Sequence, residues 1–474
     1  MSRIFIKTTP QYIGKDITLR GWVRTRRDHG KITFIDLWDA TGIIQCVLSP
    51  DQKEAYSVGE KLRSEWVVEF EGEVKARPEK MVNAKIPTGA VEFLVKKAAV
   101  LSEAQELPLD IKSDGHDIKE ELRIKYRYLD LRRERLQHIM KLRAQAKKWI
   151  GDYLALHNFT EIETPIMTKS TPEGARDFII PSRLHPGKFY ALPQSPQQYK
   201  QLLMIAGFER YFQFPHVFRD EDLRADRLFE HTQLDVEMSF VDQEDILSLI
   251  EEMIIGLSEQ VFGKTIQEKP FPRIPYQEAI EKYGSDKPDL RKDKNDANLL
   301  AYAWIVDFPM FEKLEDGSID AVHHPFTAMR EEDFPLFDKI NPSKISAKNK
   351  EALFKIRAKQ YDLALNGMEV MGGSIRTHDP KILAKVFQVL GHKKEQVEQK
   401  FGHLLEAFSY GVPPHGGIAA GFDRLLQAIL GEKSIRETVA FPTTTSGVTS
   451  VMDAPSEVEE KQLKELGIKV VKKL

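Results

Sequence analysis

The sequence predicts an α+β protein of several domains, with a small all-β unit at the N-terminus and a larger mixed unit after it. Five short strand-like runs separated by turn residues fill the first hundred residues. The remainder mixes helical and strand-like segments. Since domains usually hold about 100–200 residues, the length of 474 residues suggests two to four of them.

The composition narrows the class of protein. Lys and Arg number 69 against 72 Asp and Glu, and this net charge of −3 argues against indiscriminate coating of nucleic acid, while allowing a local basic face. A single Cys excludes a disulfide framework or a thiolate-rich metal site. No apolar run is long enough for a membrane helix, and the first residues lack the features of a signal peptide. We therefore expect a cytoplasmic protein with no membrane partner.

Residues 1–105 predict a five-stranded β-barrel. The runs cover residues 17–23, 31–38, 42–48, 66–74 and 91–95, and a helical stretch at 52–62 follows the third run. Five strands with a helix after the third are typical of an OB-fold. That fold commonly binds single-stranded nucleic acid on its strand face.

A polar connector at 106–134 leads into the mixed unit, residues 135–474, which opens with a long amphipathic helix from about 135 to 157. The sequence FTEIETPIM at 159–167 follows it. Pro165 lacks an amide donor, so this strand should lie at a sheet edge. An edge strand beside a long helix is a plausible dimer surface, although an ordinary helix–strand unit explains it equally well.

Two further segments carry charge at positions where phosphate can bind. The sequence FRDEDLRADR at 218–227 precedes HTQLDVEM at 231–238, which predicts two antiparallel strands around a charged loop. Arg219 falls at a strand end, where its guanidinium can hold a phosphate bidentately. In GGIAAGFDRLL at 416–426, Arg424 opens a helix, a position that favours anions. Taken singly, the two segments could equally be a solvated hairpin and a glycine-rich turn.

In this order and spacing, the three segments resemble motifs 1, 2 and 3 of the class II aminoacyl-tRNA synthetases, and within that class the bacterial aspartyl-tRNA synthetases. The sequences TPEGARD at 171–177, QSPQ at 194–197, HHPFT at 323–327 and GGSIR at 372–376 extend the resemblance, which runs from about residue 15 to the end. It implies a catalytic domain built on an antiparallel sheet flanked by helices, an anticodon-binding OB-fold, a hinge at 106–134 and a homodimer. It also implies activation of L-aspartate by ATP, with Mg²⁺, and transfer of aspartyl to tRNA(Asp).

The resemblance assigns site residues one by one. Lys200 and Arg376 would bind the side-chain carboxylate of the substrate aspartate. Glu173 and Asp235 would bind its ammonium group. The aspartate-binding residues are Glu173, Ser195, Gln197, Lys200, Arg219, Asp235, His323 and Arg376. The ATP-binding residues are Arg219, Asp220, Glu221, Leu228, His231, Glu369, Gly421, Phe422, Asp423 and Arg424.

Asp362 and Glu369 would hold Mg²⁺. Their spacing of seven residues matches two helical turns, and Gly367 suggests a helix that ends and runs into a strand.

The resemblance also places tRNA contacts on the barrel. Phe34 and Gln45 match positions that stack on and read anticodon bases, and Arg26 and Arg27 would contact phosphates. The rival interpretation of Phe34 is a barrel-core residue.

Two further positions bear on the choice of tRNA. His29 resembles forms that charge both tRNA(Asp) and tRNA(Asn), whereas Lys80 resembles the specific type. The two signals conflict, and we favour the relaxed form.

The sequence departs from the family at two places. The family usually carries an inserted domain between motifs 2 and 3, but here only a short bridge near 285–303 is present. The motif 2 loop reads RLFEHTQ at 227–233, where RQPEFTQ is usual. The smaller, titratable imidazole of His231 therefore replaces the aromatic ring expected against adenine, which predicts somewhat weaker ATP binding.

Three alternatives remain. The first is an asparaginyl- or lysyl-tRNA synthetase, opposed by Lys200 and Arg376 in one pocket. The second is a non-catalytic RNA-binding or regulatory paralogue, opposed by the presence of both motif arginines and both Mg²⁺ acids. The third is an amide-forming ligase related to asparagine synthetase, which lacks the barrel.

Overall fold

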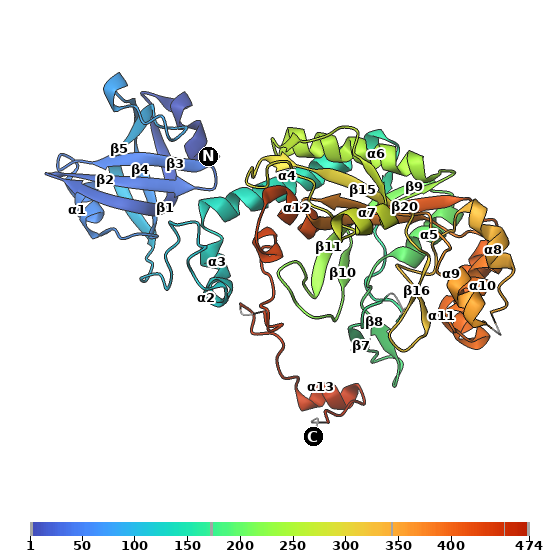
Figure 1. Cartoon of the computed structure of the whole chain (residues 1–474). Helices are drawn as coiled ribbons and strands as arrows, with labels where there is room; N and C mark the ends of the chain where they lie inside the picture. Colours follow the sequence, from blue (N-terminus) through green and yellow to red (C-terminus); the bar gives the residue numbers. More distant parts are fainter. Residues whose placement is uncertain (1–2, 171–173, 343–344, 450, 472–474) are drawn as a thin grey trace. The chain divides into compact units, whose positions relative to one another are not determined.

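The computed structural model describes residues 3–170, 174–342, 345–449 and 451–471. It divides into two units, Met1–Asp110 and Ile111–Leu474 (Figure 1). Within the described residues, no helix is long and apolar enough to cross a membrane.

The first unit is a closed five-stranded barrel of order β1-β2-β3-β5-β4, which confirms the predicted OB-fold. Its elements are η1 (Ile6–Tyr12), β1 (Asp16–His29), β2 (Ile32–Asp39), β3 (Gly42–Leu48), α1 (Lys53–Lys61), β4 (Val67–Ala76), η2 (Glu79–Met81) and β5 (Val91–Ser102). The core residues alternate along the strands, as Ile35 and Leu37 do on β2. Phe34 lies between Thr33 and Ile35, half-buried and outside the barrel core, so its interpretation as a core residue is wrong.

The second unit is built on a nine-stranded sheet of order β13-β15-β18-β19-β20-β11-β9-β6, with β10 paired to β11. The strands are β6 (Thr160–Glu161), β9 (Arg210–Gln213), β10 (His216–Phe218), β11 (Glu230–Ser239), β13 (Arg273–Pro275), β15 (Tyr302–Val306), β18 (Gln360–Leu365), β19 (Met368–Ile375) and β20 (His415–Gly421). All pairings between β15 and β9 are antiparallel, and only the two edge strands pair in parallel. The expected antiparallel sheet flanked by helices is confirmed.

One face of this sheet is covered by α4 (Glu134–Leu156), α6 (Gln243–Gly256) and α12 (Phe422–Leu430) (Figure 1). Apolar residues of the three helices pack on alternate residues of the strands, such as Leu234 and Val236 of β11. Because side chains alternate across a sheet, Gln233, Asp235 and Glu237 point to the opposite face. The strand period therefore gathers polar side chains on the face that carries the site.

The prediction of a helix between Asp362 and Glu369 is wrong, because β18 and β19 form a hairpin there. Asn366 and Gly367 make the turn with φ values of 51° and 91°. Asn-Gly is the preferred pair for a two-residue hairpin turn, since both residues tolerate positive φ. The Asn366-Gly367 dipeptide predicts this hairpin, whereas the seven-residue spacing of Asp362 and Glu369 suggested a helix.

Motif 1 yields a shorter strand than expected. Only Thr160 and Glu161 pair with β9, but β6 does lie at the end of the sheet, as Pro165 predicted. Between α7 (Tyr276–Tyr283) and β14 (Leu299–Leu300), residues 284–298 contain no helix or strand. This part of the chain therefore has no room for an inserted domain.

The second unit contains further elements beside the sheet and the three helices. They are α2 (Glu120–Lys125), α3 (Arg127–Asp130), β7 (Ile179–Pro181), β8 (Phe189–Ala191), α5 (Gln197–Ile205), η3 (Leu257–Val261), β12 (Thr265–Ile266), β16 (Phe311–Lys313), β17 (Ile319–Ala321), η4 (Glu331–Asp333), α8 (Phe334–Asp338), α9 (Ala347–Leu353), α10 (Pro380–Val389), α11 (Lys394–Phe408), η5 (Ile435–Thr438) and α13 (Glu460–Glu465).

Candidate active site

Two adjoining cavities open on the polar face of the sheet. The first, of about 350 Å³, lies between the motif 2 hairpin and the start of α12, and the second, of about 630 Å³, lies over β11, β18 and β19. Both are lined by Arg219, Gln233, Glu369, Gly372 and Ala419. Groups bound in the two cavities would therefore meet beside Arg219.

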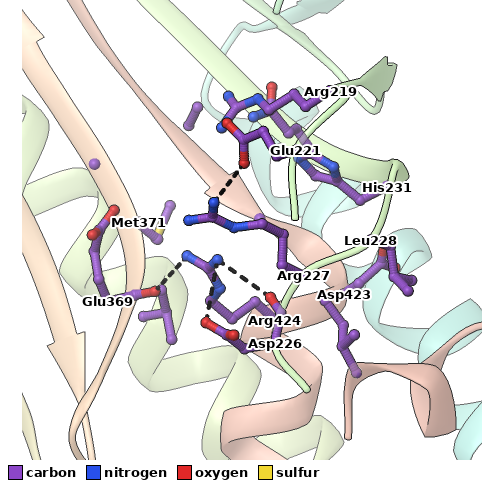
Figure 2. Close-up of a pocket in the computed structure, with 16 residues that line it drawn as sticks. Arg219, Glu221, Asp226, Arg227, Leu228, His231, Glu369, Met371, Asp423 and Arg424 are labelled. Atoms are coloured by element: carbon purple, nitrogen blue, oxygen red, sulfur yellow. Dashed lines mark hydrogen bonds and ion pairs between the residues drawn. The ribbon is translucent and has the colours of Figure 1, made fainter. Parts of the chain in front are cut away.

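The first cavity is rich in charge (Figure 2). Arg227 Nη1 lies 2.7 Å from Glu221 Oε2, an ion pair across the motif 2 loop. Arg424 Nη2 donates to the carbonyl of Asp226 at 3.3 Å and lies 3.6 Å from its carboxylate. The Nε of Arg424 is buried and has no hydrogen-bond partner in the described part of the chain, which leaves one donor of this cation for a ligand.

Most residues predicted to bind ATP line this cavity: Arg219, Glu221, Leu228, His231, Glu369, Gly421, Asp423 and Arg424. The structure places two others away from it. Phe422 is fully buried in the core beneath the sheet, where its ring packs edge-on against Phe214. The backbone of Asp220 pairs with that of Arg176, and their side chains lie 3.4 Å apart.

Asp423 lines the cavity but is engaged with the protein. Its carboxylate accepts the backbone N–H of Thr232 at 2.9 Å and pairs with Arg143 of α4. It therefore fixes the start of α12 against the motif 2 strand, and its role in the geometry is to place Arg424.

His231 is uncharged at neutral pH. Burial lowers its pKa to about 3, and the nearby cations Arg219 and Arg424 add to the effect. The expected titratable charge beside the adenine is therefore absent, although the imidazole still offers less area than a phenyl ring.

The two acids expected to hold Mg²⁺ face one point. A Cβ built on Gly372 would lie 2.9 Å from Asp362 Oδ1 and 3.7 Å from Glu369 Oε1. Burial raises the pKa of Asp362 well above its usual value, and the negative charge of Glu369 raises it further. Gln360 donates to Asp362 Oδ1 at 2.8 Å. A pair of facing carboxylates of this kind, one of which is buried and hard to ionise, suits a divalent cation with oxygen ligands.

The second cavity contains a buried network of opposite charges. Lys200 Nζ lies 2.7 Å from Asp235 Oδ1 and 3.2 Å from Glu237 Oε2. Arg376 donates to both oxygens of Glu237, at 2.9 and 3.1 Å. Burial alone would raise the pKa of Glu237, but the charges of Arg376 and Lys200 outweigh it and lower this pKa to about 2. Gly417 leaves room for the carboxylate, since a Cβ there would lie 2.0 Å from Glu237 Oε2.

The same cavity exposes unsatisfied polar groups. Among the residues that the structure describes, Asp235 Oδ2 is buried without a hydrogen-bond partner, as are Gln197 Nε2, Gln233 Oε1 and Gln360 Oε1. Such atoms are costly in a folded protein and point to a bound polar ligand. Burial also raises the pKa of Asp235, which a cationic group at Oδ2 would offset.

Every described residue predicted to bind aspartate lines this cavity: Ser195, Gln197, Lys200, Arg219, Asp235, His323 and Arg376. Glu173 lies outside the described residues, and its neighbour Gly174 lines the cavity. Burial lowers the pKa of His323 to about 4, so this side chain is neutral near pH 7.

Sequence reasoning missed Glu237 and His324. His324 Nε2 accepts from Arg376 Nη1 at 2.9 Å, and Ser374 Oγ accepts from the same nitrogen at 2.7 Å. The pKa of His324 is lowered well below its usual value, by burial and then by Arg376, so the ring is a neutral acceptor. The alternation of Asp235 and Glu237 on one strand was a usable signal, because both must reach the same face.

On the barrel, the strand register brings Arg27, Phe34 and Gln45 to neighbouring positions. Arg27 lies opposite Phe34, and Asp36 lies opposite Gln45. Arg27 is largely exposed and pairs with Asp36 at 2.7 Å.

Three other predicted barrel residues lie differently. Arg26 pairs with Asp28 and donates to the carbonyl of Glu60, so it braces the barrel. His29 and Lys80 are both exposed, at the end of β1 and in η2.

Comparisons with known proteins agree with this architecture. Residues 119–445 match the family described as tRNA synthetases class II (D, K and N), and residues 17–101 match an OB-fold nucleic acid binding domain. An aspartate–tRNA(Asp/Asn) ligase of Halothermothrix orenii is 40% identical, with 98% of this chain and 97% of that protein covered. An aspartate–tRNA ligase of Staphylococcus haemolyticus is 38% identical, with 98% of each covered.

Solved structures share the fold at lower sequence identity. Asparaginyl-tRNA synthetase from Pyrococcus horikoshii superposes with a TM-score of 0.75 at 24% identity, covering 94% of this chain and 99% of that one. Aspartyl-tRNA synthetase from Entamoeba histolytica gives a TM-score of 0.71 at 22% identity, covering 93% and 91%. With both units matched over nearly their whole length, the chain belongs to the class II tRNA synthetases of the aspartate, lysine and asparagine group.

Proposed function

We propose that this chain is an aspartate–tRNA ligase. It activates L-aspartate with ATP and transfers the aspartyl group to the 3′ end of tRNA(Asp). The observation that carries the proposal is the pair of adjoining cavities that share Arg219, one suited to a nucleotide and the other to a small amino acid with two carboxylates.

The charges of the second cavity fit aspartate. Lys200 and Arg376 offer two cations for the side-chain carboxylate, and the unpartnered Oδ2 of Asp235 offers an anion for the ammonium. Asparagine would leave part of the cationic charge unpaired in a buried site, which is costly. Lysine would bring a second ammonium toward Lys200 and Arg376. This pocket therefore favours aspartate over the other two amino acids of the family.

The shared position of Arg219 fits the first reaction. An oxygen of the α-carboxylate attacks the α-phosphorus of ATP, the bond between the α-phosphorus and the bridging oxygen breaks, and pyrophosphate leaves. Arg219, at the junction, would hold both the carboxylate and the α-phosphate, and Arg424 would hold the γ-phosphate. No protein nucleophile is needed, because positioning and charge neutralisation lower the barrier.

Asp362 and Glu369 would hold Mg²⁺, which neutralises phosphate charge when bound. Glu221 would accept from the adenine amino group while keeping its pair with Arg227, since a carboxylate has several acceptor sites. The neutral ring of His231 would lie against one face of the adenine and Arg424 against the other. In the second step, a 3′-terminal hydroxyl of tRNA attacks the activated carbonyl carbon, and AMP leaves.

The barrel would bind the anticodon of this tRNA. Phe34 and Gln45 would stack on and read bases, and Arg27 would meet phosphates, as the outer face of β1–β3 allows. Arg26 is tied to Asp28 and Glu60, so it would contact a phosphate only while keeping these bonds. We propose that tRNA(Asn) is charged as well, since His29 and the Asp/Asn names of relatives favour this, while Lys80 opposes it.

We propose a homodimer that forms at motif 1. The strand β6 at the end of the sheet and the exposed Ile166 and Met167 beside it offer an apolar surface. A monomer by light scattering at micromolar concentration would contradict this assembly.

A missing insertion is also consistent with the comparison. The alignment with the H. orenii enzyme spans 591 positions, 117 more than the 474 residues of this chain. Any contact between such an inserted domain and tRNA would be absent here.

The direct test is ATP–pyrophosphate exchange without tRNA, run in parallel with aspartate, asparagine and lysine. We expect exchange with aspartate alone. Exchange with asparagine or lysine would point to the other members of the group. Exchange with none of them would favour a regulatory RNA-binding protein.

A further inference from the structure

A buried cluster of arginines and acids lies at the start of the second unit, away from both cavities. Asp130, which is fully buried at the end of α3, accepts hydrogen bonds from three guanidinium groups. The donors are Arg123 Nε at 3.0 Å, Arg127 Nη1 at 2.7 Å and Arg133 Nε at 2.6 Å. The carboxylate thus ties α2, α3 and the residue before α4 together.

Glu437 of η5 is the second acid of the cluster. It accepts from Arg123 Nη1 at 3.0 Å and Nη2 at 2.8 Å, and from Arg135 Nη2 at 2.7 Å. Arg123 therefore bridges Asp130 and Glu437, two acids that are 307 residues apart in the sequence. The guanidinium group of Arg123 therefore joins α2, which follows the barrel in sequence, to η5, which follows motif 3.

The cluster has more positive than negative charges, and the remaining guanidinium donors bind backbone carbonyl oxygens. Arg127 donates to the carbonyls of Arg436, Val439 and Ala440 at 2.8, 2.9 and 2.9 Å. Burying such a cluster is expensive, and its best-attested benefit is to fix one arrangement of neighbouring segments. Here the fixed segment is η5 together with the residues that follow it.

η5 in turn holds the motif 2 loop. The backbone N–H of Ile435 donates to the carbonyl of Ala225 at 2.8 Å, and Arg436 Nη1 donates to the carbonyl of Arg224 at 3.3 Å. Ile435 itself lines the nucleotide cavity, as do the next two loop residues, Asp226 and Arg227 (Figure 2).

We propose that Arg123, Arg127 and Glu437 are positioning residues of the nucleotide site, acting through η5 on the motif 2 loop. The inference rests on the proposed function, since it assigns the loop to ATP. It predicts a selective effect. The structure of the described ranges shows no hydrogen bond from η5 to Lys200, Asp235, Glu237 or Arg376, so the aspartate pocket should be affected much less than the nucleotide site.

The test compares Glu437→Gln and Arg127→Lys with Glu251→Gln as a matched control. Glu251 is as buried as Glu437 and accepts two hydrogen bonds, from Phe271 N and Trp304 Nε1, but lines neither cavity. We expect the two cluster variants to raise the KM for ATP about tenfold and the KM for aspartate much less, because the lost charged hydrogen bonds loosen the loop at Arg224 and Ala225, and only Arg219 at its start reaches the second cavity. The control should leave both KM values unchanged.

A second readout needs no activity. Hydrogen–deuterium exchange of the peptide 219–231 should be faster in the cluster variants, while a peptide over 360–375 keeps its wild-type rate. Unchanged exchange at 219–231 in a folded variant, or equal changes in both KM values, would overturn the inference. If one variant does not fold, the other carries the test. If the wild type showed no ATP–pyrophosphate exchange, the proposed function would be overturned. The hydrogen–deuterium exchange rate of peptide 219–231 would still decide whether the cluster holds the loop.

Discussion

The Oδ2 oxygen of Asp235, which has no hydrogen-bond partner among the described residues, gives the sharpest test of how the second cavity recognises its substrate. Replacement by Asn keeps the shape and one oxygen for Lys200, but removes the charge that would face the ammonium. A charged hydrogen bond in a buried site is worth about 1.5–3 kcal/mol, and breaking one partner of a buried pair costs about 3–5. We therefore expect kcat/KM for aspartate to fall roughly 30- to 1000-fold, which corresponds to about 2–4 kcal/mol.

The assay is aspartate-dependent pyrophosphate exchange, with succinate as a competitive inhibitor. Succinate keeps both carboxylates of aspartate and lacks the ammonium. Its inhibition constant should change little in Asp235→Asn, because the substitution removes no contact that succinate makes. The preference for aspartate over succinate should therefore collapse by most of the predicted factor. Equal losses for aspartate and succinate would refute the reasoning, since they would mean that Lys200 had moved.

Four further predictions follow from the geometry. Glu237→Gln should lower the free energy of unfolding by about 3 kcal/mol at pH 7, because the native pKa lies at about 2 against a usual 4.5. Since the pKa of Glu237 is lower in the folded state than in the unfolded state, its stabilising effect is lost as the carboxylate becomes protonated. In urea denaturation, the difference in free energy of unfolding between wild type and variant should therefore shrink as the pH falls from about 4.5 to about 2. A difference that does not depend on pH would contradict this. Gly372→Ala should reduce exchange roughly 100-fold and raise the Mg²⁺ requirement, because the new Cβ would lie 2.9 Å from Asp362 Oδ1; a wild-type Mg²⁺ titration would argue against the site. Phe34→Ala should weaken tRNA charging by about 1–3 kcal/mol while leaving exchange intact, and unchanged charging would remove Phe34 from the tRNA surface. His231→Phe should lower the KM for ATP through added stacking area, and a higher KM would show that the imidazole is preferred.

The order of elements was readable from local pattern. The five runs of the barrel, the edge position of β6 and the strand-to-helix turn before Arg424 all follow from alternation, Pro165 and glycine spacing. The site residues came from resemblance, and the structure gathers all the described aspartate residues into one cavity. Where the prediction failed, at Asp362 and Glu369, a spacing compatible with a helix was given more weight than the Asn-Gly turn signal.

The fold class, the family and the identity of the charged side chains could all be predicted from the amino-acid sequence. Those properties depend on local periodicity, turn chemistry and motifs within single segments. The partners of these charges became visible in the folded chain: Glu237 lies between Arg376 and Lys200, Asp235 Oδ2 accepts no hydrogen bond from a described residue, His231 is neutral, and η5 contacts the motif 2 loop. Each depends on groups tens to hundreds of residues apart and on the burial that they share. Burial sets the desolvation that shifts each pKa and so decides the charge that each group carries.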